Sequence, residues 1–179
     1  MLDKKKLHVG CGSKILDGFI NIDLLDVDGI DLKCDISKLP YENNSIDLIY
    51  SCANIEHFGR KEWKGVLKHW YDLLKPGAVL RLSTADFEAA CIEYLENKNI
   101  ENLLGLIVGG QKDKYDWHGM IFDYELLETT LLEIGFNEVK KYNWRETEHG
   151  HIDDFSQAYL PHMDKEKGRL MMLNIEAIK

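Results

Sequence analysis

The chain has 179 residues, of which 45% are hydrophobic and 30% charged, a length and composition typical of one globular domain. Its formal net charge of −9 disfavours nucleic-acid backbones and anionic membranes as partners, because like charges repel. The sequence shows no secretory leader and no apolar run near the ~20 residues of a membrane span, so we expect a cytoplasmic location. The cysteines match no zinc-binding spacing and are interpreted as reduced thiols; they are Cys11, Cys34, Cys52 and Cys91.

Short strand-like runs alternate with helical patterns along the chain. The helical patterns cover residues 60–75, 86–98 and 123–136, with Asp86 as a predicted N-cap and Gly135 as a predicted C-terminal stop. The predicted strands are residues 6–11, 18–24, 30–36, 45–53, 78–85, 136–144 and 169–179.

This alternation predicts a largely parallel sheet with both faces covered. The connection over residues 145–168 has no strong helical pattern, which favours an antiparallel pairing of the last two strands. We therefore expect an α/β, Rossmann-like three-layer sandwich with a mixed seven-stranded sheet and an antiparallel strand near one edge. Residues 1–179 are expected to form a single domain, with an irregular insertion at about 100–122 placed over the site.

The stretch "LHVGCGSKILDGFINIDL", residues 7–24, has the pattern of a nucleotide-type ligand site. Gly10 and Gly12 permit a tight turn and a close approach of a ligand to the backbone. Asp23, at the end of the next predicted strand, can accept hydrogen bonds from two ribose hydroxyls. A dinucleotide is disfavoured, because Ile15 stands at the third glycine position of G-x-G-x-x-G and the acid comes too soon.

The order of several motifs resembles the class I S-adenosylmethionine-dependent methyltransferases, and among them the small predicted methyltransferases of the type 11 kind. "VGCG", Asp23, the "CDI" of residues 34–36 and the "LKPG" of residues 74–77 carry this resemblance. Two features depart from the family: His8 stands where an acid is usual, and the short gap between Gly12 and Asp23 implies that the usual first helix is truncated or replaced by a loop. The resemblance implies S-adenosylmethionine as cofactor, S-adenosylhomocysteine as product, and cofactor-binding positions at Gly10, Cys11, Gly12, Asp23, Asp35, Ile36 and Cys52.

The resemblance also implies a methyltransferase, and members of this subgroup are often linked to surface polysaccharide synthesis. We therefore expect a small-molecule acceptor, such as a sugar or a sugar-linked hydroxyl, amine or phosphoryl group. A protein or nucleic-acid methyltransferase and a non-catalytic S-adenosylmethionine-binding protein stay open as alternatives.

Methyl transfer to a hydroxyl is assisted by a base near the carboxyl ends of the strands. The predicted catalytic residues are His118, His57 and His151, and the predicted substrate-binding residues are Trp117, Arg145 and His149. His149, His151, Asp153 and Asp154 could together hold a divalent cation. Because they lie in a predicted loop, we expect no resident metal.

Overall fold

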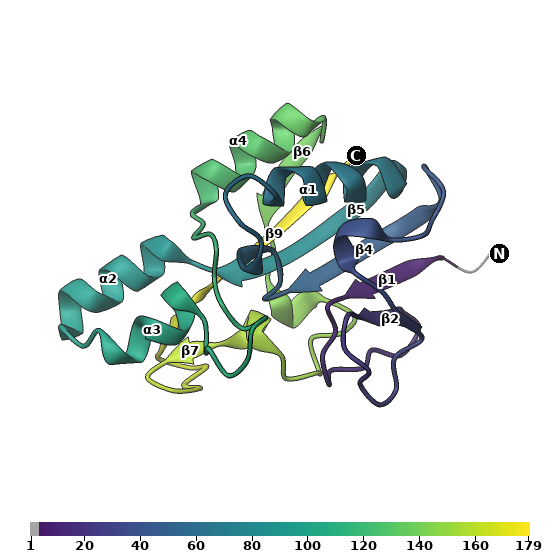
Figure 1. The fold of residues 1–179 in the computed structure, drawn as a ribbon. Coiled ribbons are helices and arrows are strands. Elements are labelled where there is room, and N and C mark those ends of the chain that lie inside the picture. Colours follow the sequence, from purple (N-terminus) through teal and green to yellow (C-terminus); the bar gives the residue numbers. More distant parts are fainter. Residues whose placement is uncertain (1–3) are drawn as a thin grey trace.

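A seven-stranded sheet forms the centre of the computed structural model, which describes residues 4–179 (Figure 1). The strand order is β3-β2-β1-β4-β5-β9-β6, and β9 runs antiparallel to both β5 and β6. This confirms the predicted mixed sheet and its antiparallel strand next to the edge. The strands are β1 (Lys6–Val9), β2 (Ile20–Asp23), β3 (Leu32–Lys33), β4 (Ile46–Cys52), β5 (Leu74–Ala85), β6 (Glu138–Lys141) and β9 (Met172–Ile178).

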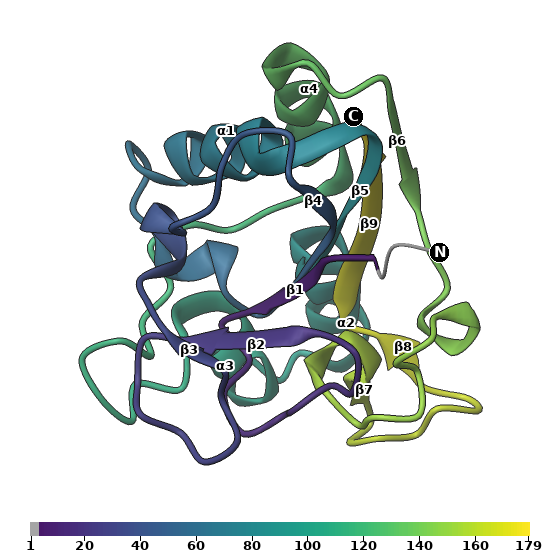
Figure 2. The same cartoon turned by 90° about the vertical axis from the view of Figure 1, so that its right-hand side faces the viewer.

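Helices α1 (Trp63–Leu73) and α4 (Tyr124–Ile134) lie together over one face of the sheet (Figures 1 and 2). The apolar stripe of α1 is buried, and the indole of Trp70 donates to the carbonyl of Ile36 over 2.8 Å. Gly135 ends α4 as predicted, with φ of 122°. Alternate residues of the strands complete this core, which contains Leu7, Val9, Ile22, Ile49, Leu80, Leu82, Leu173 and Ile175.

The opposite face of the sheet is covered mainly by loops. As predicted, no helix lies between Gly10 and Phe19; Leu16 and Phe19 pack instead against Leu48 and Tyr50 of β4. The segment 142–168 completes the cover. It contains the short elements η3 (Trp144–Glu146), η4 (Phe155–Gln157) and β7 (Tyr159–Leu160), and β7 pairs with β8 (Arg169–Leu170).

The segment 100–122 is more regular than predicted. It begins with the two-turn helix α3 (Glu101–Val108), because Leu103, Leu106 and Ile107 present apolar side chains at helical spacing despite Gly105. Helix α3 packs beside α2 (Phe87–Asn97), whose N-terminus is capped by Asp86 as predicted. Both helices extend beyond the carboxyl end of β5 (Figure 1). The rest of the segment, which we call the 109–122 loop, is irregular.

Between residues 4 and 179, no helix combines the length and the apolar character needed to cross a membrane.

Candidate active site

The glycine loop follows β1 directly and is held by Asp23. Gly10 and Gly12 have φ values of 64° and 51°, a region that favours glycine. One carboxylate oxygen of Asp23 accepts from the amide of Gly12 and the other from the amide of Leu25, each over 2.8 Å. Since a carboxylate oxygen can accept more than one hydrogen bond, both oxygens keep capacity for a ligand.

Asn54 fixes the loop from the other side. Its amide nitrogen donates to the carbonyls of Val9 and Gly10 over 3.1 and 3.2 Å. A Cβ at Gly10 would lie 1.9 Å from the Asn54 side-chain oxygen, so only glycine fits there. A Cβ at Gly12 would meet nothing within 4 Å. The space in front of Gly12 is therefore open to a ligand.

Asp35 follows β3 and begins the short element η1 (Ile36–Lys38). Its Oδ1 accepts from the amide and the hydroxyl of Ser37, and these bonds hold the pKa of Asp35 below its ordinary value. The Ile36 side chain is buried under α1. Cys11 and Cys52 are also buried, and burial raises the pKa of the Cys11 thiol to about 11. Both thiols are therefore unreactive, and these two residues would contact a cofactor only through backbone atoms or apolar packing.

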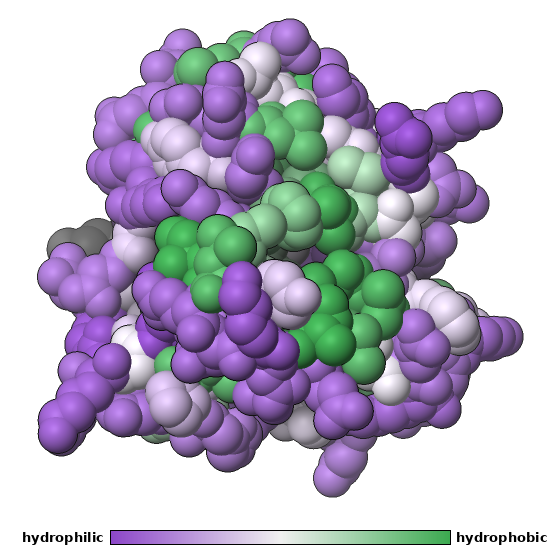
Figure 3. Space-filling model, turned by 90° about the vertical axis from the view of Figure 1, so that its left-hand side faces the viewer, coloured by the Kyte–Doolittle hydropathy of each residue, from purple (hydrophilic) through white to green (hydrophobic). Residues whose placement is uncertain are grey.

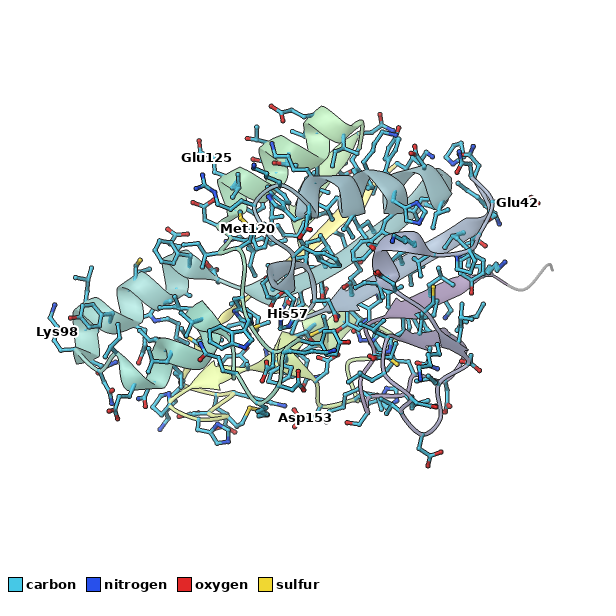
Figure 4. All side chains as sticks on the ribbon, viewed as in Figure 1. Glu42, His57, Lys98, Met120, Glu125 and Asp153 are labelled. Carbon is cyan, nitrogen blue, oxygen red and sulfur yellow. The ribbon has the colours of Figure 1, made fainter. Side chains whose placement is uncertain are left out.

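A cavity of about 510 Å³ lies at the carboxyl ends of β4 and β5. Open α/β sheets bind their ligands at this end of the strands. In Figure 4, His57 lies near the centre of the molecule and Asp153 below it, and both residues line the cavity. Further polar lining residues are Lys14, Glu56, Lys112, Asp116, His118, Asp154, Tyr159 and His162.

His57 and His118, two of the predicted catalytic residues, are brought together in this cavity. Their ring centroids are 5.0 Å apart, although 60 residues separate them. The Nδ1 of His57 lies 3.0 Å from the carbonyl of Trp117, and that of His118 lies 3.0 Å from the carbonyl of Leu106. Because a carbonyl only accepts, each Nδ1 carries a proton, and a ring that is neutral then keeps Nε2 as an acceptor.

The surroundings of His118 favour its neutral form. Burial lowers the pKa of His118, and the neighbouring His57 lowers it further. A histidine that is neutral at pH 7 can accept a proton, which is the property required of a general base.

Glu56, immediately before His57, is not among the residues predicted for the site. Its side chain is 2% exposed, lines the cavity, and has Oε2 without a hydrogen-bond partner among residues 4–179. Burial raises the pKa of Glu56. Its carbonyl accepts from the amides of Gly119 and Met120 over 2.8 and 3.1 Å, which holds the 109–122 loop against the end of β4.

The other predicted residues lie elsewhere. His151 is exposed and outside the cavity lining. His149 is buried with its ring 4.0 Å from that of Tyr50, on the sheet face away from the main core. Arg145 donates to the hydroxyl of Tyr159 and to the carbonyl of Lys165, which ties the 142–168 segment together. Trp117 is 54% exposed and contacts the site through its carbonyl.

His162 also lines the cavity while remaining exposed. The sequence gave one indication of Glu56, which is that this residue comes just after the fourth predicted strand. No cluster of three or more potential metal ligands occurs within residues 4–179.

Residues 7–82 match a family described as "Methyltransferase domain". The fold is similar to that of an S-adenosylmethionine-dependent methyltransferase from Archaeoglobus fulgidus, with a TM-score of 0.61, 15% identity, and coverage of 98% of this chain and 86% of that one. It is also similar to a possible histamine N-methyltransferase from Thermotoga maritima, with a TM-score of 0.60, 17% identity, and coverage of 100% and 84%.

A third similar structure is the 1,6-didemethyltoxoflavin-N1-methyltransferase of Burkholderia thailandensis with S-adenosylhomocysteine bound. Its TM-score is 0.58 at 13% identity, with coverage of 99% of this chain and 72% of that one. No curated protein matches the chain. The matched domain supports a methyltransferase. The solved structures show that the fold is one that S-adenosylmethionine-dependent methyltransferases have.

The residues at the glycine loop fit this cofactor. Open space in front of Gly12 and spare acceptor capacity on Asp23 suit a ribose that lies against the backbone. The Oδ2 of Asp35, which accepts no hydrogen bond from residues 4–179, is suited to an amino group. Bound S-adenosylmethionine supplies a methyl group already activated by its sulfonium.

Proposed function

We propose that the enzyme methylates a small acceptor, a sugar or a sugar-linked molecule, which enters the cavity beside His57 and His118. The observation that carries this proposal is the histidine pair: two imidazole rings from distant parts of the chain meet in one cavity at the carboxyl ends of β4 and β5. The likeness to methyltransferases linked to surface polysaccharides supports a sugar as the acceptor. Unpaired thiols at all four cysteines support action in the cytoplasm.

In this proposal, the acceptor hydroxyl lies against Nε2 of His118. The ring orientation is fixed because Nδ1 donates to the carbonyl of Leu106. The Nε2 would accept the hydroxyl proton as the oxygen takes the methyl group, which S-adenosylmethionine would supply, with S-adenosylhomocysteine as the leaving group. Asp153 and Lys14 offer polar contacts to the remaining hydroxyl groups, and the 109–122 loop restricts the access of water.

His118→Ala tests this assignment. General-base removal typically lowers rates by ~10²–10⁴, so single-turnover methyl transfer from labelled S-adenosylmethionine should fall by that order. Sugar and amine panels supply the acceptor. Calorimetry should show S-adenosylhomocysteine affinity nearly unchanged, because His118 lies outside the glycine loop. His57→Ala should show a smaller loss of rate.

His151→Ala is the matched control, because this histidine is exposed and outside the cavity. It should keep wild-type turnover. The wild-type rate should rise with pH through a value below 6.5, the ordinary pKa of histidine, because burial lowers the pKa of His118. Full activity in His118→Ala, or an equal loss in His151→Ala, would remove His118 from the mechanism.

A further inference from the structure

One wall of the cavity is apolar, although the acceptor proposed above is polar. Leu106 of α3, Leu160 of β7 and Met171, between β8 and β9, belong to one packed apolar cluster and also line the cavity. Met163 and Met172 extend this wall. We call these five residues the apolar wall. Nothing in methyl transfer itself requires such a wall.

The apolar wall adjoins the histidine pair. The carbonyl of Leu106 holds Nδ1 of His118 at 3.0 Å, while the Leu106 side chain packs in the apolar cluster. A ligand whose reacting group reaches His118 therefore also lies beside the wall. Hydroxyl groups placed against leucine and methionine side chains would lose hydrogen bonds to water without replacement. An acceptor made only of a sugar is thus poorly matched to this side of the cavity.

Apolar side chains continue on the outer surface beside the cavity. Figure 3 shows them gathered at the centre of the face that carries α2 and α3. Exposed members from these helices and the adjoining loops include Leu95, Ile100, Leu104, Val108, Tyr115 and Trp117.

We propose that the acceptor is an amphiphile, in which a polar head that takes the methyl group is joined to an apolar chain. The head lies at His57 and His118, and the chain lies along the apolar wall. This inference rests on the proposed function and names its substrate class. The unbranched, flexible methionines of the wall suit a chain, because they adapt to irregular apolar shapes.

The test is calorimetry on the protein saturated with S-adenosylhomocysteine. The probes are n-alkyl β-D-glucosides from methyl to octyl, each kept below its micelle-forming concentration. Burial of a methylene typically contributes ~0.8 kcal/mol, so affinity should rise about fourfold per methylene until the wall is covered. The absence of a dependence on chain length, including no binding of any member, overturns the proposal.

Leu106→Asp should abolish the dependence on chain length, because a carboxylate then faces the chain. Leu104→Asp is the matched control: it lies on the same helix but is 46% exposed and outside the cavity lining, so it should keep the dependence. An equal loss in both variants places the chain on the outer surface and overturns the assignment to the wall. If Leu106→Asp no longer binds S-adenosylhomocysteine, Met163→Asp replaces it with the same expectation.

The two proposals fail in different ways. If wild-type protein does not bind S-adenosylhomocysteine, the proposed function itself fails. Normal S-adenosylhomocysteine binding together with equal affinity for methyl and octyl glucoside overturns only the amphiphilic acceptor.

Discussion

Asp23 connects the end of β2 to the glycine loop, and we expect cofactor binding to depend on it more than on any other residue. Its two oxygens hold the amides of Gly12 and Leu25 and keep acceptor capacity for ribose hydroxyls. Hydrogen bonds to charged groups contribute ~1.5–3 kcal/mol each. Asp23→Ala should therefore lower S-adenosylhomocysteine affinity at least about tenfold in calorimetry. Asp28→Ala, an exposed acid in the next loop, should leave it unchanged; an unchanged affinity in Asp23→Ala would refute the assignment.

His149 was predicted to bind substrate, but its position indicates a contribution to stability. It is 3% exposed, and burial, aided by Arg81, lowers its pKa to about 4. In the unfolded chain its pKa is ~6.5. Between these two pKa values the unfolded state binds more protons than the folded state. Neutral His149 therefore contributes its full stability above pH ~6.5, and this contribution is lost as the pH falls toward 4.

His149→Phe should remove this pH dependence. Urea unfolding of the wild type should show about 2–3 kcal/mol less stability from this group at pH 4.5 than at pH 7. The free energy of unfolding of His149→Phe should lack that part of the decrease. His151→Phe changes an exposed position two residues away, and its free energy of unfolding should decrease with pH as that of the wild type does. The idea fails if the two variants behave alike.

At the scale of elements, the 109–122 loop is fixed by its contact with the end of β4. The amide of Gly119 donates to the carbonyl of Glu56 over 2.8 Å, and a Cβ at Gly119 would lie 2.7 Å from the carbonyl oxygen of Phe58. Gly119→Ala must therefore displace the loop and the adjacent His118. Since a 1 Å misplacement can cost ~10² in rate, turnover should fall at least tenfold, with S-adenosylhomocysteine affinity retained.

Gly65→Ala is the control for this substitution. Gly65 is exposed in α1, and a Cβ there meets nothing within 4 Å. Alanine should raise the free energy of unfolding by up to ~1 kcal/mol and leave turnover unchanged. Wild-type turnover in Gly119→Ala would show that the loop does not position His118.

Local patterns predicted the seven strands of the main sheet, three of the four α-helices and the glycine loop, because each depends on residues close in sequence. Asp86 begins α2 and Gly135 ends α4, each through contacts within a few residues. The role of the 142–168 segment could not be predicted in this way. Its anchors join distant residues: Tyr50 donates to Asp154 over 2.5 Å, and Arg81 donates to Glu148 over 2.9 Å.

The same limit applies to the candidate site. His57 and His118 were identified separately from their positions after a strand and before a helix, but their contact depends on the path of the 109–122 loop. His149 and Arg145 are polar residues in a predicted loop, and the sequence gave no sign that His149 is buried against Tyr50 or that Arg145 donates to Tyr159 and Lys165. Histidine and arginine in loops therefore need tertiary contacts before a role can be assigned.

At the scale of the whole molecule, the net charge of −9 favours a small molecule over a nucleic acid as the methyl acceptor, because an acidic protein repels phosphates. Non-specific nucleic-acid binding arises from cations that neutralise phosphates, with Kd typically 10⁻⁴–10⁻⁶ M at physiological salt. The cavity lining contains two lysines, Lys14 and Lys112, beside the acids Glu56, Asp116, Asp153 and Asp154.

Fluorescence anisotropy with a labelled 20-nucleotide DNA or RNA should therefore detect no binding. The measurement is made at about 50 mM salt, because low salt strengthens any phosphate contact and so makes the test stringent. The same oligonucleotides should leave methyl transfer to the small acceptor uninhibited. Binding that weakens steeply with added salt, together with methyl incorporation into the RNA or DNA, would instead favour a nucleic-acid methyltransferase.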